Sequence, residues 1–118
     1  LRQIGNEYED VAVAYLVRKG YKVRHRQYRC RRGEMDIVCQ DGDIIVFVEV
    51  KGRRTTRFGF PQEAIDEWKA RRLWHIAEHY LWHHSLHDHI CRFDVIAILK
   101  DAVGGYKINH IQSAFSLI

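Results

Sequence analysis

Apolar residues near the start of the chain recur at steps of three and four, the spacing that places side chains on one face of an α-helix. These residues are Ile4, Tyr8, Val11, Ala12, Tyr15 and Leu16. Asn6 can cap the first turn and Gly20 can end the last one, so we expect a helix over residues 6–19. On a helical wheel Glu9 lies roughly 20° from Leu16, which places this acid at the border of the apolar stripe.

Five later segments have the alternating or continuously apolar pattern of β-strands. They span residues 21–28, 35–40, 44–50, 90–99 and 106–111. The third segment, IIVFVEV, is almost entirely β-branched or aromatic, which is typical of a central strand buried on both faces. Asp41 and Gly42 precede it and predict a hairpin turn between the second and third strands.

A second helix is predicted from Pro61 to about residue 84, because Pro favours a first helical turn and apolar residues follow at helical spacing. Those residues are Ile65, Trp68, Leu73, Ile76, Ala77, Tyr80 and Leu81. The element order α-β-β-β-α-β-β predicts an α/β fold in which helices flank a mixed central sheet. The length of 118 residues fits one domain with one core.

Nothing in the composition indicates a membrane protein or a secreted one. No run approaches the roughly 20 apolar residues of a membrane span, and no charged-then-apolar leader opens the chain. Cys30, Cys39 and Cys91 form no CxxC pair, and their odd number argues against a disulfide framework. We therefore expect free thiols, a cytoplasmic location and no membrane partner.

Basic residues are concentrated in two segments, although the net charge is only +4. Residues 11–33 and 50–62 contain no Asp or Glu, and they hold twelve of the 19 Lys and Arg residues. Arg dominates both segments, and its guanidinium forms bidentate contacts with phosphate. If the segments meet on one face, that face attracts a phosphate backbone, so we expect a nucleic-acid partner. A solvated basic surface without a partner is the alternative.

Two acids and a lysine lie inside apolar strand segments, where a charged side chain is costly unless it is paired or binds a metal ion. They are Asp36 in the run MDIV, and Glu49 and Lys51 in the run FVEVK. Because Glu49 and Lys51 are two positions apart, they point to the same face of their strand.

The predicted hairpin decides whether Asp36 lies near Glu49. If residues 41 and 42 form a two-residue turn, Gln40 pairs with Asp43, and Asp36 falls opposite Phe47. Asp36 is then a diagonal neighbour of Glu49 on the same face. Two such carboxylates can bind a hard divalent cation, and a nearby lysine can stabilise charge at a scissile phosphate. The alternative is a structural ion pair between Glu49 and the lysine, with Asp36 capping a strand end.

The run GEMDIV, followed by FVEVKGR, resembles the PD-(D/E)xK nuclease superfamily, which includes the archaeal Holliday-junction resolvases. Over nearly its whole length the chain also resembles the YraN-like bacterial proteins. The matching positions include Gly5, Glu9 and Ala12, the two runs above, Phe58-Gly59, Lys69, the run RFDV at 92–95 and the run INHI at 108–111. The resemblance implies a restriction-endonuclease-like αβββαβ core. Met35 stands where the superfamily motif has a proline.

The resemblance also implies roles for individual residues. Asp36 and Glu49 would bind Mg²⁺ or Mn²⁺, Lys51 would be the catalytic lysine, and Glu9 would be the helix acid of the resolvase-like branch. The implied function is an endonuclease that hydrolyses DNA, with branched or structured DNA and a homodimer both compatible. A nucleic-acid-binding module that keeps the fold without catalysis is the alternative. Contacts with nucleic acid are expected from Arg24, Arg26, Arg31, Arg32, Arg53, Arg54, Arg57 and Lys69.

Two further groups on the second predicted helix allow both a structural and a functional interpretation. The histidines are His75, His79 and His83, and the tryptophans are Trp68, Trp74 and Trp82. Histidines four apart can bind zinc, but the helical wheel turns the first two away from the apolar side, which favours a hydrated face. We expect the tryptophans in the core or at a partner contact rather than stacked on bases.

Asp94 follows Arg92 in an apolar strand, and a local ion pair is the simplest account of this acid.

Overall fold

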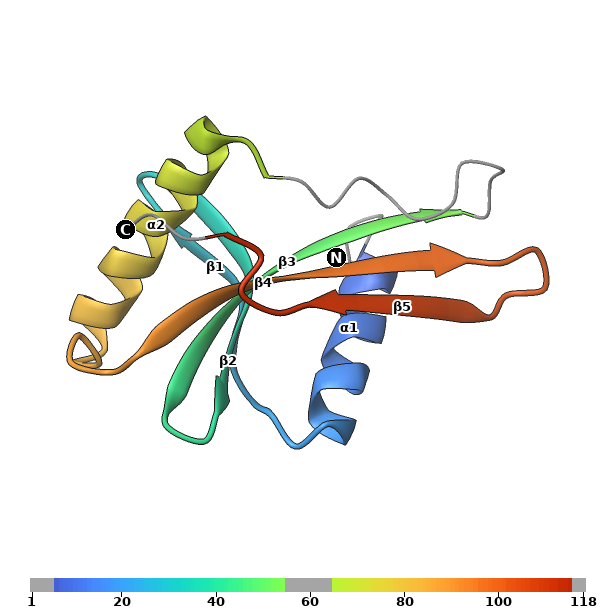
Figure 1. Ribbon diagram of the computed structural model, residues 1–118, viewed down its shortest axis with the longest axis horizontal. Coiled ribbons are helices and arrows are strands. Elements are labelled where there is room, and N and C mark those ends of the chain that lie inside the picture. The colour runs from blue at the N-terminus through green and yellow to red at the C-terminus, as the bar shows by residue number, and fades with distance from the viewer. Residues whose placement is uncertain (1–5, 55–64, 116–118) are drawn as a thin grey trace.

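The computed structural model describes residues 6–54 and 65–115, which fold as a five-stranded sheet with a helix on each face (Figure 1). The elements are α1 (Asn6–Arg18), β1 (Lys22–Cys30), β2 (Gly33–Asp41), β3 (Ile44–Arg54), α2 (Glu67–His83), β4 (Cys91–Lys100) and β5 (Tyr106–Ile111). The predicted element order and the α/β class with an αβββαβ core are therefore confirmed.

The strands lie side by side in their sequence order, β1-β2-β3-β4-β5. β3 and β4 are parallel, and the other neighbours are antiparallel. α2 provides the crossover that a parallel pair requires. The sheet is therefore mixed, as expected.

The two helices build separate cores on opposite faces of the sheet. Leu16 of α1 packs with Val46 and Val48, whereas Tyr80 of α2 packs with Phe47 on the other face. Residues 45–48 are all buried, which confirms the predicted central strand. Neither described helix has the length and apolarity needed to cross a membrane.

α2 begins later than its pattern predicts. The extended residue Asp66 is the N-cap, and its carboxylate accepts the Lys69 backbone N–H at 2.8 Å. The predicted helix is therefore wrong at residues 65 and 66, although Ile65 still packs against the core. Pro61, the predicted start, lies outside the described residues. The apolar spacing reports which residues reach the core, whereas the cap decides where the helix starts.

The β2–β3 hairpin turns one residue later than predicted. Asp41 pairs with Ile44, so the turn residues are Gly42 and Asp43. Gly42 has a φ of +60°, the left-handed conformation that glycine adopts without steric cost. The later turn shifts each cross-strand pair by two positions, so the paired side chains of residues 37–41 and 44–48 keep their predicted faces because the strand period is two.

The sheet branches beyond this hairpin. Pairing between β2 and β3 ends at Ile37 and Val48. From there β2 continues along β1 as far as Gly33, and β3 continues along β4 as far as Arg54. In Figure 1 the β3 and β4 arrows run on together, away from α2 and from the β1–β2 turn. β3 is longer than its apolar run suggests because β4 goes on pairing with its basic end.

Candidate functional site

Asp36 and Glu49 lie opposite each other at the branch point, each directly past the last β2–β3 pair. The sequence-based register, with Asp36 opposite Phe47, is wrong, because Phe47 pairs with Val38. The later turn brings the two acids closer than the predicted diagonal arrangement. A side-chain hydrogen bond joins their carboxyl groups.

Asp36 also replaces a missing backbone contact. Its Oδ2 accepts the Val50 N–H at 2.8 Å. Since β2 and β3 no longer pair at this level, that amide would otherwise lack a partner on the β2 side. The branch in the sheet therefore determines where this carboxyl group points.

The environment of Asp36 favours its protonated form. Burial and the negative charge of Glu49 raise the pKa of Asp36 from 3.8 to about 8, although the Val50 amide acts in the opposite direction. At neutral pH Asp36 therefore retains a proton and can donate it in the hydrogen bond to Glu49. A divalent cation would relieve the repulsion that opposes ionisation of Asp36 beside Glu49.

Lys69 brings a positive charge to this pair from α2. Its Nζ lies 2.5 Å from Oε2 of Glu49, and the Glu49 side chain is only 14% exposed. The sequence predicted Lys69 only as a contact for nucleic acid. Nothing in the sequence near either residue indicates that Glu49 and Lys69 lie close together in space. Lys51 is partly buried two residues past Glu49 on β3, and its catalytic role stays a prediction.

Glu9 is a third acid near the pair, and it contributes to the raised pKa of Asp36. It is 5% exposed on α1, in agreement with its place at the border of the apolar stripe. Its carboxylate accepts the Arg26 Nε–H at 2.7 Å and a hydrogen bond from the Gln27 amide. Glu9 therefore has its own donors rather than a place in the hydrogen bond between Asp36 and Glu49.

Gln27 is a site neighbour that the sequence did not reveal. It has a φ of +54°, and it lies between the β1–β2 pairs of Arg26 and Tyr28, which places it opposite Asp36. This conformation turns the Gln27 side chain to Glu9, beside the neighbouring contact from Arg26. A left-handed glutamine inside a strand has no signature in the hydrophobic pattern.

Close packing positions α1 beside β3. A Cβ added at Gly52 would lie 2.2 Å from Cγ of Tyr8, so only glycine leaves room for this ring. Tyr8 precedes Glu9, and Gly52 follows Lys51. The glycine of the run VKGR therefore lets α1 approach the strand that carries the candidate catalytic residues.

The carboxyl pair suits a hard divalent cation such as Mg²⁺, which takes a few carboxylate oxygens and completes its shell with water. Asp36 and Glu49 would supply those oxygens. Among the described residues, no three His, Cys, Asp or Glu side chains are grouped so as to hold a metal ion. Glu9 therefore lies near the pair without completing a ligand set.

Besides Lys69, two of the predicted nucleic-acid contacts, Arg24 and Arg26, are held by other side chains of the protein. Arg24 donates hydrogen bonds to the Tyr80 hydroxyl at 3.0 Å and to the Gln40 side chain at 3.1 Å. Arg26 binds Glu9, as described above. A role in nucleic-acid binding stays a prediction for both arginines.

The remaining predicted arginines lie on two branches of the sheet. Arg31 and Arg32 are exposed in the β1–β2 turn, which packs beside α2. Arg53 and Arg54 end β3. Arg57 lies outside the described residues. The two described pairs of arginines, one from each basic segment, thus lie on different branches of the sheet, with the carboxyl pair at the branch point between them. The condition that both segments meet on one face is not met by these arginines.

Asp94 belongs to a buried polar network in which the predicted ion pair with Arg92 is confirmed, at 3.0 Å. Asp94 also accepts hydrogen bonds from His110, at 2.8 Å, and from the Ser113 backbone N–H, at 3.0 Å. Although burial opposes it, these hydrogen bonds lower the pKa of Asp94. The carboxylate is 1% exposed, so it holds β4 and the C-terminal segment together rather than facing a substrate.

The aromatic residues of α2 divide between core and surface. His75 and His79 are exposed, as expected for a hydrated face. Trp74 packs against the core, whereas Trp68 is 73% exposed and Trp82 is 63% exposed. Of the three tryptophans, only Trp74 is therefore confirmed as a core contact. A partner contact for Trp68 and Trp82 stays a prediction.

Comparisons with known proteins identify the family. The group described as "Uncharacterised protein family UPF0102" matches residues 8–98. A UPF0102 protein of Caldicellulosiruptor saccharolyticus is 41% identical over 115 residues, which cover 97% of this chain and 98% of that protein. Those of Geobacter sulfurreducens (45% identical, covering 97% and 89%) and Syntrophomonas wolfei (46%, covering 97% and 98%) are similar. The protein therefore belongs to the UPF0102 family, the YraN-like group that its sequence resembles.

Proposed function

We propose that this protein is a metal-dependent endonuclease that hydrolyses phosphodiester bonds in DNA, with branched or otherwise structured DNA as the substrate class. The carboxyl pair of Asp36 and Glu49 carries the proposal. The two groups meet at the branch of the sheet, where the pKa of Asp36 is raised to about 8. A partly buried pair of acids that holds a proton at neutral pH argues against a purely structural role and favours a site where a cation replaces that proton.

Each residue of the site has a task in this proposal. Asp36 and Glu49 would hold Mg²⁺ or Mn²⁺, which would polarise the scissile phosphate and activate the attacking water. Holding the cation would require Asp36 without its proton and Glu49 without its contact to Lys69. Lys51 stabilises negative charge at the scissile phosphate. Glu9, which Arg26 and Gln27 hold in place, keeps a negative charge near the pair.

Nuclease assays with branched, flapped, single-stranded and duplex DNA, each with Mg²⁺ or Mn²⁺, test the proposal. We expect cleavage by the wild type and a loss of about 100-fold or more for Glu49→Ala and Lys51→Ala. Glu67→Ala is the matched control, because Glu67 is an exposed acid that pairs with Arg71 on the surface of α2. Absence of cleavage of every substrate, or equal cleavage by Glu49→Ala, would refute the proposal.

A second candidate function is nucleic-acid binding without cleavage. The observation that favours it is the ion pair between Lys69 and Glu49, which neutralises the acid without a metal ion. This function predicts DNA binding that weakens with salt and survives Asp36→Ala. A binding titration at several salt concentrations, run alongside the cleavage assay, separates the two functions. A homodimer stays a prediction that analytical ultracentrifugation tests.

A further inference from the structure

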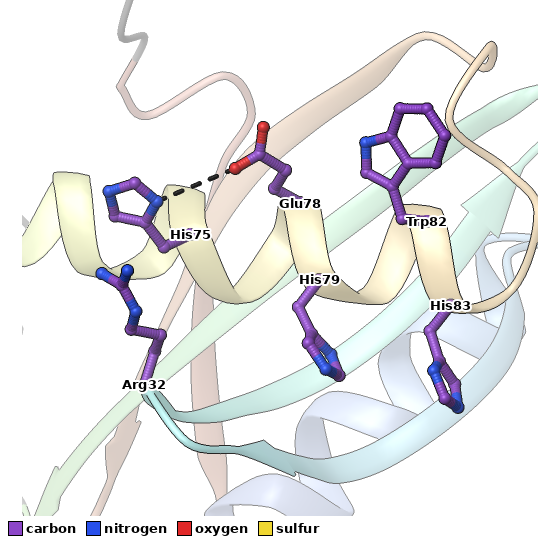
Figure 2. Close-up of a pocket in the computed structure, with 6 residues that line it drawn as sticks. All are labelled: Arg32, His75, Glu78, His79, Trp82 and His83. Atoms are coloured by element: carbon purple, nitrogen blue, oxygen red, sulfur yellow. Dashed lines mark ion pairs between the residues drawn. The ribbon is translucent and has the colours of Figure 1, made fainter.

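A pocket outside the candidate active site lies against α2 and has a volume of about 590 Å³. It is lined by Arg32, His75, Glu78, His79, Trp82 and His83. Figure 2 shows Glu78 and Trp82 on one side of the helix, His79 and His83 on the other, and Arg32 reaching toward it from the β1–β2 turn. Its volume lies within the range of about 300–1,000 Å³ that is usual for small-molecule sites.

Trp82 offers a flat aromatic surface at this pocket. Trp82 is 63% exposed. It stacks on the His87 ring, with centroids 3.9 Å apart and planes 5° from parallel. The stack with His87 fixes the orientation of the Trp82 indole. The part of the indole that remains exposed can then stack on a second flat group. Nucleobases stack on such aromatic side chains whatever their sequence.

The polar groups of the pocket suit the other parts of a nucleotide. Arg32 forms no ion pair with the described residues, and its guanidinium can bind a phosphate group. Glu78 can accept hydrogen bonds from an exocyclic amino group of a base, and its nearest basic neighbour is His75, at 3.8 Å. An apolar partner would leave these charged groups desolvated, whereas a nucleotide pairs with them.

The pocket lies on the helix that also contributes to the candidate active site. Lys69 contacts Glu49, and a rise of about 1.5 Å per residue puts His75 roughly 9 Å and Trp82 roughly 20 Å further along the axis of α2. A strand of duplex DNA advances about 3.4 Å per nucleotide, and an extended single strand advances more. A strand held at the active site therefore spans the distance to the pocket with a few nucleotides.

We infer that this pocket binds an unpaired stretch of the substrate strand, with one base on Trp82 and a phosphate of a neighbouring nucleotide at Arg32. This inference rests on the proposed function and narrows its substrate class to DNA with a single-stranded segment beside a duplex. Glu78 adds a preference for cytosine, because its carboxylate can accept from the N4 amino group of cytosine, whereas unpaired thymine offers only its single N3–H.

Fluorescence anisotropy in EDTA tests the pocket without any cleavage. The probes are a labelled duplex and the same duplex with a short single-stranded oligocytidine or oligothymidine tail. We expect the tail to increase affinity. Trp82→Ala should weaken binding of the tailed probes by about 5- to 150-fold, the range of one lost base-stacking contact, and leave the blunt duplex unaffected.

Three variants make the test specific. Trp82→Phe should restore most of the tail-dependent affinity, because phenylalanine keeps a stacking face. Trp68→Ala is the matched control, because Trp68 is an exposed tryptophan of α2 that does not line the pocket. Glu78→Ala should remove the preference for the cytidine tail over the thymidine tail.

The outcomes separate this inference from the proposed function. Equal affinity of the wild type for tailed and blunt duplexes would overturn the pocket assignment, even if the protein cleaves DNA. An equal loss for Trp68→Ala and Trp82→Ala would also overturn it. A tail-dependent gain that Trp82→Ala removes supports the pocket, even if the nuclease assay shows no cleavage.

Discussion

Substitution of Gly52 by alanine tests how α1 is positioned beside the candidate active site. The added Cβ would lie 2.2, 2.4 and 2.6 Å from three carbons of the Tyr8 ring. Ordinary carbon contacts are about 3.5–4.0 Å, so the ring or the strand must move by roughly 1 Å or more. Overpacking of this size costs about 1–3 kcal/mol, and we expect Gly52→Ala to lower the free energy of unfolding by that amount.

A double-mutant cycle with Tyr8→Ala isolates this clash. Without the ring, Gly52→Ala should be neutral or stabilising by about 0.5 kcal/mol, because alanine in a strand loses less backbone entropy on folding than glycine. Urea denaturation of the wild type, both single variants and the double variant gives the coupling free energy, which we expect to be about 1–3 kcal/mol. Equal costs of Gly52→Ala with and without the Tyr8 ring would refute this account of the packing.

Three further predictions follow from the charged groups. Because the pKa of Asp36 is raised to about 8, the folded metal-free protein holds a proton that the unfolded chain loses near pH 4, and its stability should fall as the pH rises between these values. At about 1.4 kcal/mol per pKa unit, Asp36→Asn should therefore exceed the wild type by on the order of 5 kcal/mol at about pH 9 and match it near pH 4 in urea denaturation. A pH-independent difference would contradict this. Asp94→Ala should cost about 3–5 kcal/mol in thermal denaturation, because Arg92 and His110 lose their buried acceptor, and a cost below about 1 kcal/mol would count against the network. Since the pKa of Asp94 is lowered, its contribution should be present above the unfolded-state value of about 3.9 and lost as the pH falls through the lower native value. Lys69→Met should tighten Mn²⁺ binding about 3- to 10-fold in isothermal titration calorimetry, because the ammonium group no longer competes for the carboxylate, and an unchanged affinity would argue against that competition.

The local pattern of the sequence determined the elements and, over most of each element, the face that a side chain takes. Helical spacing identified the apolar stripe of α1 and left Glu9 at its border, where the structure buries it. The hairpin turn was predicted one residue too early, yet Asp36 and Glu49 still share a site. That agreement survives because the error moved each pair by two positions and a strand repeats every two residues.

Only the tertiary structure decided what surrounds the acids. The branch of the sheet directs Asp36 to the Val50 amide, and the start of α2 brings Lys69 to Glu49. The first contact depends on where pairing between β2 and β3 ends. The second depends on the N-cap, which sets where the first turn of α2 begins. The pocket at Trp82 arises in the same way, from a helix packed beside a turn that lies far from it in sequence. Periodicity determines which way a side chain faces along its own element, whereas its neighbours depend on how distant elements pack together.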